Sequence, residues 1–460
     1  MTDLPKTGLQ KVDLLLDARW VAPMTTTPDS VNENSTLLLE NHTCVVHDGM
    51  IIDVLPTHIS RKQYQAQFEY SLGEHLLMPG LFNGHAHAAM SLLRGFADDH
   101  PLMTWLEQHI WPAEAAHVST AFVKTGTELA LCEMLASGVT CFNDMYFFPE
   151  TVCELLDTTG LRGCVSGPIL EFPTSWGKNA NDYIDKNTDI IQQYKNHPLI
   201  AAGYGPHAPY TVSNTTFEKI IQQATSEQTW IHTHLHETAF EIHQSMTDFG
   251  MRPTERLNKL GFFDIQSQAV HMTQITDIDI EILAGKPCHV VHCPESNLKL
   301  ASGFTPIGKM LDANINISFG TDGAASNNDL DMVSELRTGA ILAKAVSENA
   351  QTMPAYAAAY AATRGGALAF SQQHLGCVAQ GFAADIIAID LSDLNTQPVY
   401  DPIAQFVYAS NSRQISHVWV NGKLVCHHGE VKVIDTQKLK AEVKTWRATI
   451  AELALKTASQ

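Results

Sequence analysis

The sequence lacks several features that would place it in a specialised class of protein. Its nine cysteines include no Cys-x-x-Cys pair, so no disulfide framework is indicated. No apolar run approaches the roughly 20 residues that cross a bilayer. Residues 1–5 (MTDLP) carry neither the basic nor the apolar segment of a secretory signal. We therefore expect a protein of the reducing cytoplasm with no membrane partner.

Clusters of basic residues are also absent. The chain has 29 Lys and Arg against 49 Asp and Glu, a formal net charge of −20. Because nucleic-acid binding depends on clustered Lys and Arg, a phosphate-backbone partner is excluded. A hydrophobic fraction of 45% and a charged fraction of 17% over 460 residues are typical of a globular enzyme with a large core.

Both ends of the chain have a sequence pattern typical of short β-strands separated by turns. Residues 10–78 contain runs such as VDLLL and TCVV followed by HDG, and residues 385–426 contain DIIAID and HVWV followed by NG. We predict one small composite β-sandwich built from residues 1–74 and 381–460, with a terminal helix over 436–456 that serves packing or oligomerisation.

The middle of the chain, residues 75–380, alternates apolar runs with helix-like stretches, as parallel βα units do. Eight such units predict a (β/α)8 TIM barrel, whose chemistry lies at the carboxyl ends of the strands. An open doubly wound sheet is the rival fold, but no GxGxxG opens any helix. The eight predicted strand ends lie near His87, Asp144, Ile169, His207, Glu237, His271, His292 and Asp322.

Histidines with strand spacing gather at these ends. In a strand, residues i and i+2 project from one face, so His85 and His87 can bind one metal ion. The segment 230–237 (WIHTHLHE) places His232, His234 and His236 on one strand face, with Glu237 just beyond. Each of these histidines could instead be an ordinary surface or core residue.

Taken together and in order, these motifs resemble the amidohydrolase superfamily, and most closely its methylthioadenosine/S-adenosylhomocysteine deaminase group. The motifs that carry the resemblance are PGLFNGHAH (79–87), His234-x-x-Glu237, His271, SNLKL (296–300) and GTDGAAS (320–326). The resemblance covers nearly the whole chain, both flanks included.

The resemblance implies a mononuclear site for one divalent metal ion, expected to be Zn²⁺, on His85, His87, His234 and Asp322. Binuclear relatives use a lysine at the end of the fourth strand, where this chain has YGPHAP (204–209). His232 and His236 remain the alternative ligands. Iron is also compatible with this donor set.

The same resemblance implies hydrolytic deamination, in which metal-bound hydroxide attacks C6 of an adenine ring and ammonia leaves. Glu237 would protonate ring N1, Asp322 would move the water proton to the amine, and His271 would orient the attacking oxygen. The substrate would be a small purine nucleoside, and we expect a homo-oligomer. His292, Asn297 and Lys299 lie in a recognisable motif, but spacing assigns them only to the pocket rim.

The long segment 94–114 is implied to cover the pocket. In the family, Glu114 matches a carboxylate that binds ribose hydroxyls, and His207 matches another substrate contact. Trp105 in the covering segment suits an apolar tail, although helix packing explains it equally well. We therefore expect Glu114, His207, Trp105, Glu237 and Asp322 to contact the substrate.

The chain departs from the family in the residues that would bind an amino-acid tail. Members that use S-adenosylhomocysteine offer a loop arginine to its carboxylate, but no arginine lies between Arg162 and Arg252, and Lys178 is the only basic residue in the loop after the third strand. We therefore expect methylthioadenosine and adenosine to be better substrates than S-adenosylhomocysteine.

Two alternatives stay open at this point. The chain could be a deaminase or dechlorinase of a free base or a triazine in the same superfamily. It could also be a non-catalytic metal-binding protein that has kept the scaffold. Glu237 favours an enzyme, because a structural zinc site uses four closed ligands and no proton carrier.

Overall fold

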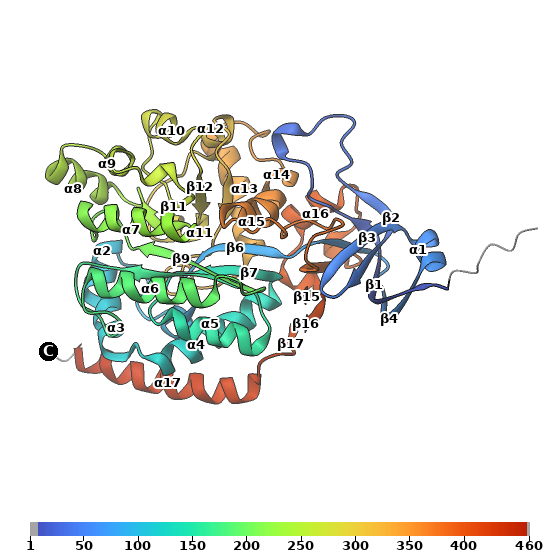
Figure 1. Ribbon diagram of the computed structural model, residues 1–460, viewed down its shortest axis with the longest axis horizontal. Coiled ribbons are helices and arrows are strands. Elements are labelled where there is room, and N and C mark those ends of the chain that lie inside the picture. The colour runs from blue at the N-terminus through green and yellow to red at the C-terminus, as the bar shows by residue number, and fades with distance from the viewer. Residues whose placement is uncertain (1–7, 458–460) are drawn as a thin grey trace, which may run out of the picture.

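The computed structural model describes residues 8–457, which form an eight-stranded parallel barrel and a nine-stranded mixed sheet (Figure 1). The barrel occupies the left and centre of the view, and the mixed sheet lies at its right-hand side. In the described residues no helix is long and apolar enough to cross a membrane. The predicted fold class, a TIM barrel with a small β domain, is confirmed.

The barrel strands follow one another in chain order, each hydrogen-bonded to the next in parallel. Every residue of the second, third and fifth of these strands is buried. Helices cover one face of each strand and the side chains inside the barrel cover the other. The strands are β6 (Leu81–Ala86), β7 (Val139–Asp144), β8 (Gly163–Ile169), β9 (Ile200–Pro206), β10 (Ile231–Leu235), β11 (Ser267–His271), β12 (Cys288–His292) and β13 (Ile317–Phe319).

The barrel closes between its first and last strands. The backbone N–H of Asp322, just after β13, donates to the carbonyl of His85 in β6 over 3.0 Å. Gly320 permits this approach, because a Cβ there would lie 2.8 Å from the His85 nitrogen. The closing contact therefore brings the first and last metal-binding candidates together.

Helices cover the barrel from outside and are capped as their sequences indicate. Ser119, Asn179, Ser213 and Thr238 each accept a backbone N–H at a helix start. The covering helices are α4 (Thr120–Ala136), α5 (Pro149–Thr159), α6 (Ala180–Tyr194), α7 (Asn214–Glu227), α8 (Ala239–Phe249), α9 (Pro253–Lys259), α10 (Asp277–Leu283), α11 (Pro294–Lys299), α12 (Ile307–Asp312) and α13 (Met332–Ser347).

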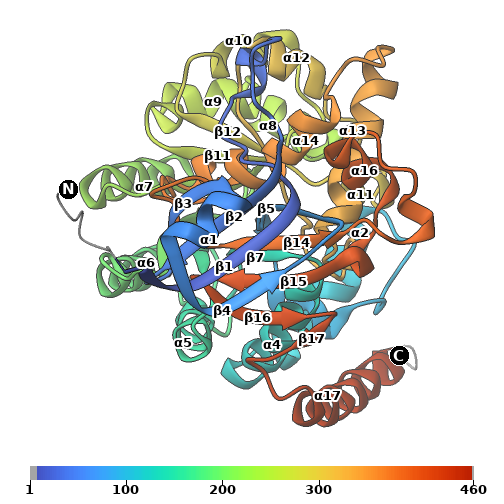
Figure 2. The same ribbon diagram turned by 90° about the vertical axis from the view of Figure 1, so that its right-hand side faces the viewer.

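The mixed sheet is built from both ends of the chain, as predicted. Figure 2 shows its strands side by side in front of the barrel. The N-terminal part contributes β1 (Gln10–Val21), β2 (Leu39–His47), β3 (Met50–Pro56), β4 (Tyr64–Ser71) and β5 (His75–Pro79), and the C-terminal part contributes β14 (Ile386–Asp390), β15 (Ile415–Val420), β16 (Lys423–His427) and β17 (Glu430–Val431).

The two parts of this sheet meet where β5 pairs antiparallel with β14, from Pro79 opposite Ile386 to His75 opposite Asp390. Leu14 and Cys44 from one end share a buried core with Ile386 and Trp419 from the other. The chain passes into the barrel between β5 and β6, a few residues after the predicted start of the barrel at residue 75. The ranges 1–74, 75–380 and 381–460 remain our proposed domains.

The terminal helix α17 (Thr436–Thr457) packs along the barrel helix α4. The Trp446 ring meets the Phe122 ring edge-on at 5.3 Å, and Leu439 and Ile450 are buried. The predicted helix over 436–456 thus has a packing role within the chain.

One buried ion pair joins the barrel to the mixed sheet. Arg162, before β8, donates from Nε to Asp385 Oδ2 over 2.6 Å, and both side chains are less than a tenth exposed. Replacing Arg162 by methionine should destabilise the protein by about 3–5 kcal/mol, because the Asp385 carboxylate stays buried without its partner. Urea unfolding measures this loss.

Two controls accompany that measurement. Lys259→Met removes the exposed Lys259–Glu255 pair, whose side chains are about half exposed, and should cost less than about 1 kcal/mol. The double variant Arg162→Met/Asp385→Leu should recover much of the stability, since no buried charge remains. A single-variant loss no larger than that of Lys259→Met would contradict a stabilising role for the pair.

Candidate active site

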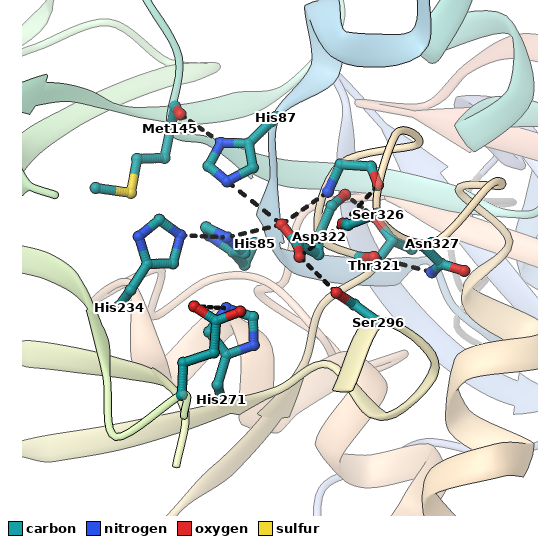
Figure 3. A network of polar contacts seen from close by, with 12 residues as sticks. His85, His87, Met145, His234, His271, Ser296, Thr321, Asp322, Ser326 and Asn327 are labelled. Atoms are coloured by element: carbon teal, nitrogen blue, oxygen red, sulfur yellow. Dashed lines mark hydrogen bonds and ion pairs between the residues drawn. The ribbon is translucent and has the colours of Figure 1, made fainter. Parts of the chain in front are cut away.

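Three imidazoles and one carboxylate face one another at the carboxyl ends of the barrel strands (Figure 3). His85, His87 and His234 have ligand nitrogens within 4.8 Å of one another. The Nε2 atoms of His85 and His234 are 3.1 Å apart, and Asp322 Oδ1 lies 3.4 Å from His85 Nε2 and 3.3 Å from His87 Nε2. Ligands about 2.0–2.1 Å from a tetrahedral Zn²⁺ are themselves about 3.3 Å apart, so the four side chains fit that ion.

The other nitrogen of each imidazole is anchored by the protein. His87 Nδ1 lies 2.6 Å from the Met145 carbonyl and His234 Nδ1 lies 2.8 Å from the His207 carbonyl. A carbonyl oxygen can only accept a hydrogen bond, so both rings carry their proton on Nδ1 and turn a bare Nε2 inward. Such anchors set ring orientation and tautomer in metal sites.

The electrostatics of the rings also suit a metal. Burial lowers the pKa of His85 to about 4 and lowers the pKa values of His87 and His234 as well. Neutral imidazole is the form that binds metal. At neutral pH the three rings are therefore in the ligand state.

Asp322 is held by donors on both carboxylate oxygens. Its Oδ2 accepts from Ser296 Oγ at 2.7 Å and Ser326 Oγ at 2.8 Å, and its Oδ1 accepts from the Gly323 N–H at 2.8 Å. The left-handed backbone of Asp322, with φ of 61°, directs the side chain into the barrel mouth. Oδ1 is the oxygen that faces the imidazoles.

The two alternative ligands lie outside this group. His232 Nε2 contacts His85 Nδ1 at 2.8 Å, so His232 supports His85 from behind. His236 does not share the strand face as predicted, because β10 ends at Leu235 and His236 has a positive φ of 54°. Its Nε2 lies 2.8 Å from Thr254 Oγ1, pointing away from the barrel mouth.

Glu237 and His271 stand beside the metal-binding group. Glu237 Oε2 lies 3.9 Å from His271 Nε2, and the His271 ring is stacked on the His234 ring at 5.5 Å. Burial raises the pKa of Glu237 above its ordinary value, which favours a carboxyl group that can carry a proton.

His271 is fixed from two sides. Its Nδ1 lies 2.8 Å from Asn297 Oδ1, and its carbonyl accepts from Thr305 Oγ1 at 2.7 Å. Its φ of 75° is a costly conformation for a residue other than glycine. Strained residues of this kind cluster at functional sites.

A cavity of about 510 Å³ opens above the metal-binding group. Its walls include every predicted substrate contact: Glu114, His207, Trp105, Glu237 and Asp322. Trp105 is only 5% exposed and belongs to the main core. Its side chain therefore both packs in the core and lines the cavity. In the described residues no lysine or arginine lines the cavity, and Lys178 lies exposed outside it.

Part of the roof comes from residues 101–118, which include α2 (Leu102–Trp105), the π-helical turn Leu106–Ile110 and α3 (Trp111–His117). We call these residues the lid. Burial raises the pKa of Glu114 to about 7, although the hydrogen bond from Tyr146 opposes the rise. Single-turn π-helices are frequent at functional sites.

Several residues at the site escaped sequence reasoning. Tyr146 donates its hydroxyl to Glu114 Oε1 at 2.6 Å. Glu241, which is 2% exposed, accepts the backbone N–H groups of His236 and Glu237 at 3.0 and 2.9 Å and so fixes the turn that carries Glu237. For Glu241, the one signal in the sequence that could have pointed to it is its position four residues after Glu237.

The motif residues left without roles now have positions. Asn297 contacts His271, and the His292 ring packs against the Phe319 ring with ring centres 5.9 Å apart. Lys299 Nζ donates to Asp98 Oδ1 at 2.6 Å and also contacts Asn328. Lys299 therefore ties the segment before the lid to the loop after β13.

Comparisons with known proteins agree with this geometry. The chain is 43% identical over 445 residues to a 5-methylthioadenosine/S-adenosylhomocysteine deaminase of Saccharophagus degradans, covering 96% of this chain and 98% of the relative. It is 42% identical over 442 residues to the enzyme of that name from Teredinibacter turnerae, with the same coverage.

A solved structure is similarly close. The crystal structure of an adenosine deaminase from Xanthomonas campestris with bound zinc has a TM-score of 0.93 and 42% identity, covering 97% of this chain and all of that one. Residues 76–425 match the amidohydrolase family, a stretch that contains all the metal-binding candidates. The resemblance read from the strand-end motifs is confirmed, and the chain belongs to the amidohydrolase family.

Proposed function

We propose that the protein deaminates the adenine ring of 5′-methylthioadenosine and adenosine by hydrolysis, giving the inosine-type product and ammonia, with S-adenosylhomocysteine a weaker substrate. The observation that carries this proposal is the position of Glu237, a proton carrier beside four converging metal-binding side chains at the floor of a cavity. The names of the relatives support the substrate class.

The resident group would be one divalent ion, with zinc as the proposed metal, held by His85, His87, His234 and Asp322. When bound, such an ion lowers the pKa of water to about 7 and makes a nucleophile available at neutral pH. The zinc-bound neighbour supports this choice.

The chain's own residues would then move the protons. Glu237 donates to ring N1, which makes C6 a better electrophile. Asp322 accepts a proton from the attacking water and passes it to the exocyclic nitrogen, so that the C6–N bond breaks and ammonia leaves. As C6 becomes a carbonyl, the remaining hydroxyl proton returns to Glu237 and restores its carboxyl group. His271, held by Asn297, hydrogen-bonds the attacking oxygen and keeps it on line with C6.

The cavity walls would set the substrate preference. A carboxylate on the 5′ substituent finds no Lys or Arg there among residues 8–457, since the charged side chains in the cavity lining are Glu114, Glu237 and Asp322. We expect kcat/KM for methylthioadenosine and adenosine to exceed that for S-adenosylhomocysteine by about 10-fold or more, the effect of one missing charged hydrogen bond. Steady-state kinetics with the three nucleosides test this. Equal values would refute the preference and would point to an arginine from a neighbouring subunit.

Glu114 separates nucleoside deamination from the rival reaction on a free base. A carboxylate can accept hydrogen bonds from two ribose hydroxyls, and a free base has none. Glu114→Gln should therefore lower kcat/KM for adenosine by about 10-fold or more and leave turnover of adenine nearly unchanged. An equal loss on adenosine and adenine would contradict a ribose contact.

The same residue gives a pH dependence. Burial raises the pKa of Glu114 to about 7, so the side chain is protonated below neutral pH. As the pH rises it loses this proton, and both carboxylate oxygens can then accept hydrogen bonds. KM for adenosine should fall between about pH 6 and about pH 8, one unit on either side of that pKa. The Glu114→Gln variant should lose this component, while any other titration persists in both proteins.

A further inference from the structure

The lid is attached to the barrel almost entirely by apolar contacts. Its cavity-facing residues include Trp105, Ile110 and Trp111, and the first two are nearly fully buried. At its entry, Asp98 is tied to Lys299 and Asn328, and at its exit the chain continues into α4. Between these two ends, the position of the lid is set by the contacts that residues 101–118 make with the barrel.

One polar contact crosses from the lid to the barrel. Among the hydrogen bonds and ion pairs of residues 8–457, only that from Tyr146 to Glu114 joins a lid residue to a residue beyond position 119. It is short, at 2.6 Å, and the Tyr146 ring is 3% exposed. Charge-assisted O–H···O bonds have this length and are stronger than neutral ones.

Tyr146 is itself held in register with the metal-binding group. It follows Met145, whose carbonyl anchors His87 Nδ1, and Asp144, whose carboxylate accepts the Ala88 N–H at 2.7 Å. Three consecutive residues after and at the end of β7 thus fix His87, the backbone beside it and Glu114. The hydrogen bond from Tyr146 therefore fixes the position of Glu114 relative to His87 and the metal-binding group.

We propose that Tyr146 is the positioning residue for ribose: its hydroxyl latches the lid over the cavity and holds Glu114 Oε1, leaving Oε2 for the ribose diol. This inference rests on the proposed function and deepens it. The distance between adenine C6 and the ribose hydroxyls is fixed in a nucleoside. A latch anchored beside His87 therefore selects ligands in which both ends fit at once.

The test compares Tyr146→Phe with Tyr204→Phe, which removes a buried hydroxyl bonded to Thr188 at 2.8 Å and remote from the cavity. With adenosine, Tyr146→Phe should raise KM about 10-fold and change kcat much less. With 2′,3′-dideoxyadenosine, which has no ribose diol, the rise in KM should be far smaller. Tyr204→Phe should match the wild type on both. Adding Glu114→Gln to Tyr146→Phe should cost little more than Glu114→Gln alone, because the two groups act as one unit.

Hydrogen exchange of the lid peptides tests the latch without turnover. Amides in residues 101–118 should exchange faster in Tyr146→Phe than in the wild type and Tyr204→Phe. Unchanged lid exchange, or equal KM increases for adenosine and its dideoxy analogue, would overturn the proposal. If the wild type deaminates neither nucleoside, the proposed function fails, and lid exchange still decides whether Tyr146 is the latch.

Discussion

Replacing Glu237 by glutamine should lower kcat for adenosine by about 100- to 10,000-fold, the usual contribution of a positioned general acid or base. Glutamine keeps the shape of the side chain and the hydrogen bond from its backbone N–H to Glu241, but it cannot release a proton to ring N1. Metal content and the unfolding midpoint should stay at wild-type values, because Glu237 is not a proposed ligand. Steady-state kinetics and metal analysis of one preparation measure all three quantities.

Glu150→Gln provides the matched control for this substitution. Glu150 is a partly buried carboxylate whose pKa is also raised, mainly by burial, and it accepts from Trp176 Nε1 outside the cavity. Its replacement should leave kcat near the wild-type value. A Glu237→Gln variant that keeps more than about a tenth of wild-type kcat would remove Glu237 from the proton pathway.

Replacing Asp322 by asparagine should abolish metal retention and lower kcat/KM by more than about 1,000-fold, since a metal ion contributes several kcal/mol to such reactions. The physical reason is that one amide cannot satisfy both ends of the carboxylate. Oδ2 accepts from Ser296 and Ser326, whereas Oδ1 faces His85 and His87. If the amide keeps its oxygen toward the imidazoles, its NH₂ faces two hydroxyls that must then accept instead of donate; in the other orientation the NH₂ faces the metal.

The control for Asp322→Asn is Asp331→Asn, which changes a carboxylate that caps α13 outside the cavity. Asparagine is a good N-cap, so stability and activity should hardly change. An Asp322→Asn protein that retains one equivalent of metal and near-normal activity would show that Asp322 is neither ligand nor base.

Much of the barrel could be predicted because its strands are short apolar runs that end in polar residues. The predicted ends at Asp144, Ile169, His271 and His292 are the last residues of β7, β8, β11 and β12. The predictions for Glu237 and Asp322 fall two or three residues beyond the strands. There the backbone has already turned, with positive φ at His236 and Asp322, and alternation of side chains no longer holds. This is why His236 leaves the face shared by His232 and His234.

The network around the ligands could not be predicted from one sequence. Its hydrogen bonds join residues that are far apart in the chain: Ser296 to Asp322, Asn297 with His271, and Tyr146 to Glu114. Helix and strand periodicity relates only residues close in sequence, so it does not predict such pairs. The candidate metal ligands could be predicted because strand geometry and a known motif order constrain them. Their supporting residues depend on how loops after different strands meet.

Metal analysis combined with an ammonia assay on one preparation tests whether one divalent ion on this site supports deamination. The protein as purified should hold about one equivalent of divalent metal per chain and release ammonia from adenosine. Chelation should abolish this activity, and Zn²⁺ should restore it. Full deaminase activity in metal-free protein would contradict the account, as would a fully metal-loaded protein that releases no ammonia from any purine nucleoside.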